Sequence, residues 1–465
     1  MAKKQIHNLR IDHLRYPDKG IAFLDSFGDK KEVTLRHGLP GQLVEARCGK
    51  RRRKWEGQIL QVIEPAPEEV DKRKLPCPEF GICGGCSFLN IPYEYELKLK
   101  QNMAWELLEN FSKEIHNSSV PSSIIAAPES SGYRNKMEFS FGDSSVDEGV
   151  SSTLALGIRQ RGRFYEVTVP KNCVLIPESF KAICLATLEY FRRTDERFYH
   201  KMRRTGTLRY LVLRRGEFTG EVLVNLVTTN ELDKSHLQKW ATALQMLPFD
   251  IVGILHTTSD VLSDAVVPES VDILWGRDKF YEKLRVNGKS LTFGISPFSF
   301  FQTYSAGAEL LYSTVAEFAG QTERIFDLYC GTGTIAQVLS SCANEVIGIE
   351  LVPEAVEMAI ENANANGIEN CRFIAGDVLK ILDELPQSPD VIILDPPRDG
   401  IHPKALPKLI AFGARKIVYV SCKPTSLARD LPIFIESGYN VSTLRFHDMF
   451  PRTPHIETVC LLERR

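Results

Sequence analysis

A cysteine at the end of an apolar segment is the first residue in this sequence that could do covalent chemistry. Residues 416–420, KIVYV, have the composition of a buried strand, and Cys422 lies just beyond them, next to Lys423. The thiolate is the nucleophilic form of cysteine, and a neighbouring lysine and the N-terminus of a following helix both favour it. We therefore interpret Cys422 as a candidate nucleophile. Cysteines expected in the core instead are Cys184, Cys342, Cys371 and Cys460.

Two possible proton acceptors lie close to the end of the sequence. Glu457 begins the last apolar segment, and His455 stands two residues before it. A carboxylate that abuts an apolar strand has a raised pKa, which suits a general base, and an imidazole titrates near neutral pH without such help. On chemistry alone, either residue could serve.

A glycine-rich turn indicates a site for a nucleotide-like cofactor. The segment DLYCGTGT, residues 327–334, follows an apolar strand, and Gly331 and Gly333 allow the backbone to turn tightly and to approach a ligand. The next strand ends at Glu350, where an acid accepts hydrogen bonds from ribose hydroxyls. The pattern is neither GxGxxG nor a Walker sequence, which favours S-adenosylmethionine over a dinucleotide or a nucleoside triphosphate. The alternative is an α/β domain in which these glycines only turn the chain.

A second loop of the same kind carries Asp395. The segment ILDPPRDG, residues 393–400, ends another apolar strand, and its two prolines stiffen the loop. Ligands of such folds bind at the carboxyl ends of the strands. Asp395 is therefore a candidate acceptor for a cofactor or a base, and its alternative role is that of a helix N-cap.

Three more cysteines lie together in CPEFGICGGC, residues 77–86. They lack the paired spacing and nearby histidine of most zinc sites, and no thioredoxin-like unit surrounds them. An iron-sulfur cluster takes four thiolates, and its fourth ligand can be remote in sequence. The candidates for a fourth ligand are Cys48, Cys173 and Cys184. Cys184 lies in an apolar helical segment, whereas Cys173 lies in a turn-like segment between two prolines.

The segments that position these residues alternate between strand and helix from about residue 323 onward. Short apolar strands separated by helical segments predict a parallel sheet with helices on both faces. The last two strands, residues 440–448 and 455–464, have no helix between them and predict an antiparallel edge. Residues 5–63 have the short alternating strands of a small antiparallel barrel, and residues 133–290 mix strands and helices.

Chain length and charge limit the class of protein to which the sequence can belong. A chain of 465 residues predicts about three domains. The first 60 residues carry 14 Lys and Arg against 7 Asp and Glu, which predicts a polyanionic partner, with a merely solvated basic surface as the alternative. We see no membrane span and no signal peptide in the sequence, so we expect a cytoplasmic protein whose cysteines form no disulfides.

Four motifs, in the order in which they occur along the chain, resemble those of a known enzyme family. DLYCGTGT, LDPPRDG, YVSCKPTSLARDL and FPRTPHIETVCLLER, with FFQTYSAGAELLY upstream, resemble the S-adenosylmethionine-dependent RNA 5-methyluridine methyltransferases. The match covers nearly the whole chain, and the barrel is similar to the TRAM domain of the ribosomal RNA branch. The resemblance implies a multidomain α/β fold: a TRAM-like, OB-like RNA-binding β-barrel (1–65), an α+β central domain with an iron-sulfur cluster (75–290) and a Rossmann-like methyltransferase domain (291–465).

The resemblance also implies roles for single residues. Cys422 matches the family's nucleophile, which adds to carbon 6 of uracil, and Glu457 rather than His455 matches the general base that removes the proton from carbon 5. Phe300 could stack on a displaced base or pack in the core. The expected cofactor contacts are Gln302, Tyr329, Thr334, Glu350, Asp377 and Asp395. Thr334 departs from the asparagine frequent in relatives, and Asp395 could instead face the uracil.

The family also holds a 4Fe-4S cluster on cysteines at the spacing found here. The resemblance therefore implies the ligands Cys77, Cys83, Cys86 and Cys173. Zinc on the same four residues is the alternative. Four protein ligands would saturate the cluster, so no radical chemistry is expected of it.

Together these features predict a monomeric enzyme that makes 5-methyluridine in structured RNA. The barrel and the cluster indicate 23S ribosomal RNA, with transfer RNA as the second possible substrate. The competing class is a non-catalytic RNA-binding protein or iron-sulfur assembly factor on the same scaffold. Such a protein would have no reason to keep Cys422, Glu457, Glu350 and Asp395 together.

Overall fold

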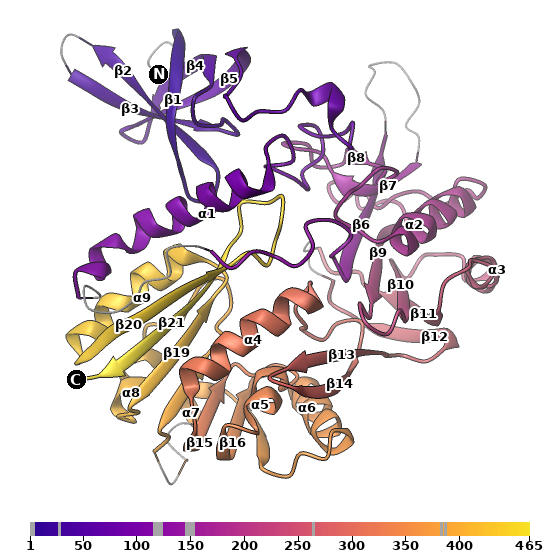
Figure 1. Cartoon of the computed structure of the whole chain (residues 1–465). Coiled ribbons are helices and arrows are strands. Elements are labelled where there is room, and N and C mark those ends of the chain that lie inside the picture. The colour runs from indigo at the N-terminus through magenta and orange to yellow at the C-terminus, as the bar shows by residue number, and fades with distance from the viewer. Residues whose placement is uncertain are drawn as a thin grey trace.

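The computed structural model describes residues 5–26, 29–114, 124–144, 154–262, 266–381, 385 and 388–465. In these residues the chain forms a closed barrel, two seven-stranded sheets and a two-stranded hairpin (Figure 1). No helix in this described part is long and apolar enough to cross a membrane. The predicted mixed α/β fold with a small barrel at its start is confirmed.

The barrel has five strands in the order β1-β2-β3-β5-β4. Side chains alternate between the two faces of each strand, so that one set, including Ile11 and Val33, fills the small interior. The basic run at residues 50–54 spans the turn between the last two strands, where Arg52 and Arg53 have positive φ. The bounds are β1 (Gln5–Arg15), β2 (Lys19–Ser26), β3 (Asp29–Arg36), β4 (Leu43–Arg51) and β5 (Lys54–Glu64).

The central sheet has the order β12-β11-β10-β9-β6-β7-β8, and only β10 and β11 pair in parallel. Helices α2 (Glu178–Phe191) and α3 (Ser235–Gln245) bury Phe180 and Trp240 against one of its faces. The bounds are β6 (Lys136–Asp143), β7 (Leu154–Arg159), β8 (Val167–Thr168), β9 (Leu208–Arg215), β10 (Val222–Thr228), β11 (Ile251–Thr258) and β12 (Ser270–Gly276). The hairpin β13 (Phe280–Val286) and β14 (Lys289–Ile295) follows.

The C-terminal sheet has the order β17-β16-β15-β18-β19-β21-β20, and β21 is antiparallel to both of its neighbours. The predicted parallel sheet with an antiparallel edge is therefore confirmed. Its strands are β15 (Thr322–Leu328), β16 (Ala343–Glu350), β17 (Cys371–Ala375), β18 (Val391–Leu394), β19 (Lys416–Ser421), β20 (Tyr439–His447) and β21 (Glu457–Arg464). Its helices are α4 (Ser305–Ala319), α5 (Thr334–Leu339), α6 (Pro353–Ala365), α7 (Val378–Ile381), α8 (Ala405–Ala411) and α9 (Pro424–Glu436).

Helix α1 (Tyr93–Leu108) joins the barrel side of the molecule to the C-terminal sheet. Its buried residues Leu99, Met103 and Leu108 belong to the same apolar cluster as residues of α9 and β20, and the helix lies along α9 in Figure 1. The 3-10 helices η1 (Lys72–Lys74) and η2 (Glu109–Glu114) flank it. The domain boundaries at residues 65, 75 and 290 stay predictions, and α1, inside the predicted central range, packs on the C-terminal sheet.

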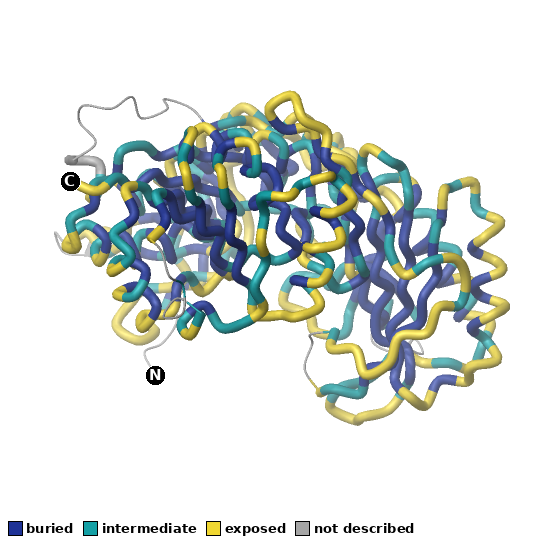
Figure 2. Tube along the Cα trace, turned by 90° about the horizontal axis from the view of Figure 1, so that it is seen from below, coloured by how far each residue is buried: buried dark blue, intermediate teal, exposed yellow. Residues whose placement is uncertain are grey.

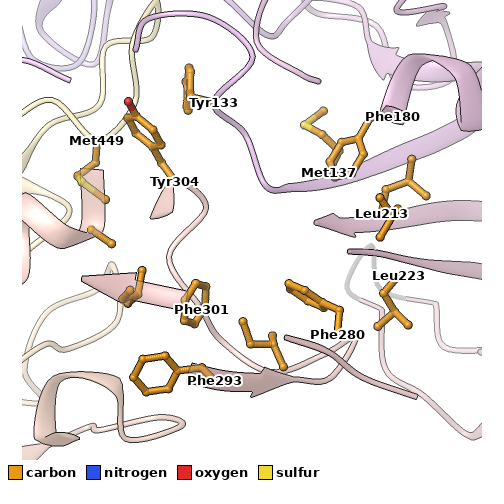
Figure 3. Packing of buried hydrophobic residues seen from close by; sticks show 14 of the residues in the cluster. Tyr133, Met137, Phe180, Leu213, Leu223, Phe280, Phe293, Phe301, Tyr304 and Met449 are labelled. Carbon is orange, nitrogen blue, oxygen red and sulfur yellow. The ribbon is translucent and has the colours of Figure 1, made fainter. Parts of the chain in front are cut away.

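The apolar core is continuous between the central and C-terminal sheets. Figure 2 shows both sheets buried along most of their strands. Phe280 and Phe293 of the hairpin and Tyr304 before α4 pack in one cluster with Met137 of the central sheet (Figure 3). The rings of Tyr304 and Tyr133 lie 4.9 Å apart between centroids. This shared core fixes the two sheets relative to each other.

Candidate active site

Three reactive side chains meet at the carboxyl end of the C-terminal sheet. Asp395 follows β18, Cys422 follows β19 and Glu457 begins β21. These strands are neighbours, and Ser421 of β19 pairs with Thr458 of β21. In an antiparallel pair the residue after Ser421 faces the residue before Thr458, so this register places Cys422 opposite Glu457.

Burial decides the state of the Cys422 thiol in the free protein. The pKa of Cys422 is raised to about 12, first by burial and then by the charges of Glu457 and Asp395, while Arg398 opposes the shift. The prediction that Lys423 and the following helix would favour the thiolate is therefore wrong for the free protein. Sequence neighbours suggested a positive surrounding, but the strand order brings two carboxyl groups to the thiol.

The other titratable groups of this site are also shifted by burial. Burial and then the charge of Asp395 raise the pKa of Glu457 well above its usual range, which confirms the raised pKa expected of that residue. Burial raises the pKa of Asp395 to about 7. Burial, followed by the charge of Arg398, lowers the pKa of His455 to about 4, so its ring is neutral at pH 7.

The glycine turn has the geometry that the sequence predicts. Gly331 and Gly333 have φ values of 54° and 71°, and a Cβ added at Gly333 would stand 2.6 Å from the ring of Phe373. The Glu350 carboxylate accepts hydrogen bonds from the N–H groups of Gly331 and Val352, both at 3.0 Å. The acid expected to bind ribose hydroxyls therefore lies beside the turn.

The remaining predicted cofactor residues lie mainly along the same edge. Tyr329, Glu350 and Asp377 end or follow the adjacent parallel strands β15, β16 and β17. The Asp377 carboxylate accepts a hydrogen bond from the backbone N–H of Leu379 at 2.9 Å. Thr334 is buried at the start of α5, and Gln302 is buried in the segment before α4.

Phe300 lies at the glycine turn. Its side chain is 65% exposed, its carbonyl accepts a hydrogen bond from the Thr332 hydroxyl at 3.3 Å, and a Cβ at Gly331 would stand 3.9 Å from its ring. Of the two roles considered for Phe300, packing in the core is therefore wrong. An exposed ring beside the cofactor turn remains available for stacking.

The four cysteines expected to hold a cluster line one small cavity of ≈ 30 Å³: Cys77, Cys83, Cys86 and Cys173. The backbone N–H of Gly85 donates to the Cys83 sulfur at 3.3 Å, and burial raises the pKa of Cys83 to about 11. The other two candidate ligands lie elsewhere, Cys48 in the barrel core and Cys184 on α2. Among the described residues, no group of three or more His, Cys, Asp or Glu is arranged to hold a metal ion. None of the eleven cysteines is joined to another by a disulfide.

Residues 217–465, more than half of the chain, match the family model described as tRNA (uracil-5-)-methyltransferase. The chain belongs to this methyltransferase family. A protein of Clostridium tetani named an RNA methyltransferase is 44% identical over 470 residues, covering 100% of this chain and 99% of its own. One of Caldanaerobacter subterraneus with the same kind of name is 44% identical over 469 residues and covers 100% of both chains. The protein is therefore an RNA methyltransferase, which decides against the non-catalytic alternative.

A solved structure shows the same fold over almost the full length. The tRNA (uracil-54, C5)-methyltransferase of Pyrococcus abyssi, in complex with S-adenosyl-L-homocysteine, has a TM-score of 0.73 and 24% sequence identity. The similarity covers 98% of this chain and 100% of that chain. The arrangement of barrel, central sheet and C-terminal sheet is thus one that a methyltransferase of known structure shares.

Two tyrosines near the methyltransferase site were not predicted. Tyr16 directly follows β1 of the barrel and is buried. Burial raises its pKa, and the charges of Cys422 and Glu457 raise it further. Tyr312 on α4 is buried, and the charges of Asp395 and then other acids raise its pKa further. Tyr16 lies in no quoted motif, and Tyr312 closes the segment FFQTYSAGAELLY, where nothing distinguishes it from the other apolar residues of the helix.

A buried ionic network holds the segment that precedes Glu457. The Lys100 ammonium on α1 lies 2.8 Å from Glu96 and 2.7 Å from Asp448, and none of these three side chains is exposed. The backbone N–H of Arg452 donates to Glu96 at 2.6 Å. The network therefore ties α1 to the loop that carries the expected general base of the methyltransferase.

A basic groove of ≈ 860 Å³ lies between the barrel and the cysteine segment. Most of its charged side chains are positive: Arg36, Arg47, Lys50, Arg51, Lys72 and Arg161, against Glu56 and Glu69. The positive charge counted in the first 60 residues is thus concentrated partly on one concave surface. Such a surface suits the phosphate backbone of an RNA substrate.

Proposed function

We propose that the enzyme transfers a methyl group from S-adenosylmethionine to carbon 5 of a uridine in 23S ribosomal RNA, through a covalent bond between Cys422 and carbon 6 of the base. The observation that carries the proposal is the position of Cys422 opposite Glu457 and beside Asp395, with the glycine turn at the end of the strand on the other side of Asp395. A nucleophile and a proton acceptor on adjacent strands suit an addition followed by an elimination. Membership in the uracil-5-methyltransferase family supports the same chemistry.

The edge with the glycine turn fits the cofactor. Glu350 would accept hydrogen bonds from the ribose hydroxyls, Asp377 would accept one from the adenine amino group, and the missing Cβ of Gly331 leaves the backbone accessible. The bound cofactor supplies a methyl group on a positively charged sulfur. We assign its contacts to Gln302, Tyr329, Thr334, Glu350, Asp377 and Asp395.

The protein residues would act in two stages. Once the thiol has lost its proton, the Cys422 thiolate would form a bond to carbon 6 of uracil, and the electrons of the C5–C6 double bond would move into an enolate. Carbon 5 would then be nucleophilic toward the methyl group of the bound cofactor, whose sulfonium would become a neutral thioether as the methyl group leaves it. Glu457 then takes the proton from carbon 5, the C5–C6 double bond forms again, and Cys422 leaves as the thiolate. Arg398 opposes the rise in the pKa of both side chains and so favours the ionised form that each stage needs. Phe300 would stack on the displaced uracil.

The RNA is the part of the proposal with two candidates. The basic groove suits the phosphate backbone of either RNA, and 23S ribosomal RNA is the substrate implied by the resemblance. Transfer RNA is the second candidate, because the structurally similar Pyrococcus abyssi enzyme is a tRNA (uracil-54, C5)-methyltransferase and its similarity covers 98% of this chain. In either case we expect a monomer acting in the cytoplasm.

We propose that Cys77, Cys83, Cys86 and Cys173 bind a 4Fe-4S cluster. Their shared cavity supports this assignment, because cysteines from two segments distant in sequence line it together with apolar residues. Anaerobic purification should yield a brown protein with about four irons per chain. A colourless protein with one zinc per chain would favour the alternative metal.

The catalytic proposal is tested with labelled S-adenosylmethionine and separate pools of 23S ribosomal RNA and transfer RNA from cells that lack the protein. Wild-type enzyme should label carbon 5 of uridine in 23S ribosomal RNA. Glu457→Gln should accumulate a protein–RNA adduct that survives denaturation, because its elimination stage is blocked. Cys422→Ala should form no adduct, and Cys371→Ala, which removes a thiol elsewhere on the sheet, should behave as wild type. Labelling of transfer RNA alone would select the second substrate, and transfer by Cys422→Ala would rule out the nucleophile.

A further inference from the structure

A second cavity, on the central sheet, is lined by aromatic rings. We call it the aromatic cavity; it is formed by Phe164, Tyr165, Tyr199 and Tyr210 and has a volume of ≈ 30 Å³. The rings of Phe164 and Tyr165 lie 4.8 Å apart at 80°, and Tyr165 stacks on His200 at 4.1 Å. Phe164 is 46% exposed. An exposed aromatic ring at the mouth of a cavity, such as that of Phe164, is a feature of interaction sites.

Three cations surround the aromatic cavity. Arg159 and Lys201 lie over the Phe164 ring at 5.0 and 6.0 Å, and Arg209 lies over Tyr199 at 5.1 Å. Arg209 also donates to the Ser259 carbonyl, which fixes its place. Cations at these positions hold the rings in place and keep the cavity positive.

The segment beside the aromatic cavity extends this positive charge. Residues 192–204 contain six Arg and Lys against two acids, and Arg203 and Arg204 are exposed at its end. Arg204 has a φ of 53° at the tip of the turn that returns to β9. Rings that accept stacking, next to clustered arginines, suit a ligand with both flat bases and phosphates.

The aromatic cavity also continues the basic groove. Arg161 lines that groove, and Phe164 follows three residues later, at most about 11 Å along the chain. The guanidinium of Arg161 donates to the Cys83 carbonyl at 3.2 Å, which anchors this turn to the cysteine segment. A strand of RNA that leaves the groove at Arg161 would therefore meet the exposed ring of Phe164.

We propose that the exposed ring of Phe164, at the mouth of the aromatic cavity, stacks on the base of an unpaired nucleotide of the RNA substrate, whose phosphates contact Arg203 and Arg204. This inference rests on the proposed function for the identity of the RNA, and it adds a second point at which single-stranded RNA is held. A folded RNA would then have to present an unpaired segment both at the catalytic edge and at the central sheet.

The test measures the affinity of the full-length protein for a fluorescent oligouridylate of about twelve nucleotides, a length that single-strand grooves hold. Phe164→Ala should weaken binding about tenfold, the loss typical of one stacked base, whereas Phe164→Trp should retain it. The matched control is Phe218→Ala in the turn between β9 and β10, because Phe218 is also 46% exposed but lies outside the cavity. Affinity for an RNA duplex of the same length should not change with Phe164→Ala.

The phosphate contacts are tested by salt. The double variant Arg203→Gln/Arg204→Gln should reduce the slope of log affinity against log salt by about 1.4, since each phosphate contact to a single strand contributes about 0.7. Equal binding by wild type and Phe164→Ala, or equal weakening by Phe218→Ala or toward the duplex, would overturn the proposal. If wild type methylates no RNA while Phe164→Ala still loses oligouridylate binding, the proposed function fails and the aromatic cavity stands.

Discussion

The catalytic edge and the cysteine cavity both bury thiols, but they surround them with different partners. The pKa of Cys422 is raised to about 12 and that of Cys83 to about 11, in both cases mainly by burial. The charged groups around Cys422 are two carboxyl groups and one guanidinium, whereas those around Cys83 are two more cysteines and one guanidinium. A thiol beside carboxyl groups can exchange its proton with them and react as a thiolate, whereas several thiols lying together can bind a metal centre as thiolates.

This difference teaches that a raised thiol pKa does not by itself distinguish a nucleophile from a ligand. Burial raises the pKa of the thiol in both places, so the pKa shift reports only that the sulfur has lost contact with water. The two regions differ in the side chains that the fold places around each sulfur. The following predictions test that separation.

The largest effect is expected at the proposed nucleophile. Cys422→Ser should lower methyl transfer about a thousandfold or more, because the proposed covalent route is lost, and should leave the iron of the proposed cluster unchanged. Cys83→Ser, by contrast, should lower the iron content measured by metal analysis. If Cys422→Ser also removed the iron, the two regions would not be independent.

The next largest effect is expected in the network that holds the loop before Glu457. Lys100→Met should lower the free energy of unfolding by about 3 to 5 kcal/mol, because it leaves Glu96 and Asp448 buried without their cation. Urea unfolding measures the change. Lys98→Met, at an exposed position of the same helix, should shift it by less than about 0.5 kcal/mol. Similar losses for both variants would contradict a role for the network.

A smaller effect is expected at the glycine turn. Gly333→Ala should lower the free energy of unfolding by about 1 to 3 kcal/mol, because a Cβ would meet Phe373 at 2.6 Å and φ is 71°. Gly367→Ala has a similar φ of 65° but nothing within 4 Å, so thermal unfolding of the pair separates the steric contact from backbone strain. An equal loss in both variants would show that Phe373 does not limit the turn.

The smallest effect concerns the pH dependence of stability at the catalytic edge. Burial raises the pKa of Asp395 to about 7 from an ordinary value near 4, so between these values the folded chain holds a proton that the unfolded chain releases. Its contribution to stability is therefore full below about pH 4 and is lost as the pH rises through 7.

Asp395→Asn removes this titration. Between about pH 5 and pH 7.5, the wild type should lose on the order of 1 to 2 kcal/mol more stability than the variant, as measured by unfolding at a series of pH values. Parallel curves for the two proteins would show that Asp395 is ionised in the folded chain throughout.

The sequence predicted the parts of the site that depend on strand ends. The glycine turn, Glu350 and Cys422 were placed correctly because each follows an apolar run whose direction in a parallel sheet is fixed. The environment of Cys422 was not predicted, because it depends on Glu457 and Asp395 from other strands rather than on Lys423 beside it. The packing of α1 on the C-terminal sheet was missed for a related reason: the Lys100–Asp448 contact joins residues 348 positions apart.

That contact has a consequence for the order in which the protein is made. Glu96 and Lys100 are synthesised well before the strand that carries Glu457 and before their partner Asp448, which follows Lys100 by 348 residues. Until that later segment leaves the ribosome, α1 lacks the charges and the apolar surface that it covers in the finished enzyme. The helix and the catalytic edge therefore mature together only after that segment is made, so a chain cut short before residue 448 would lack both the proposed base and the anchor of its first long helix.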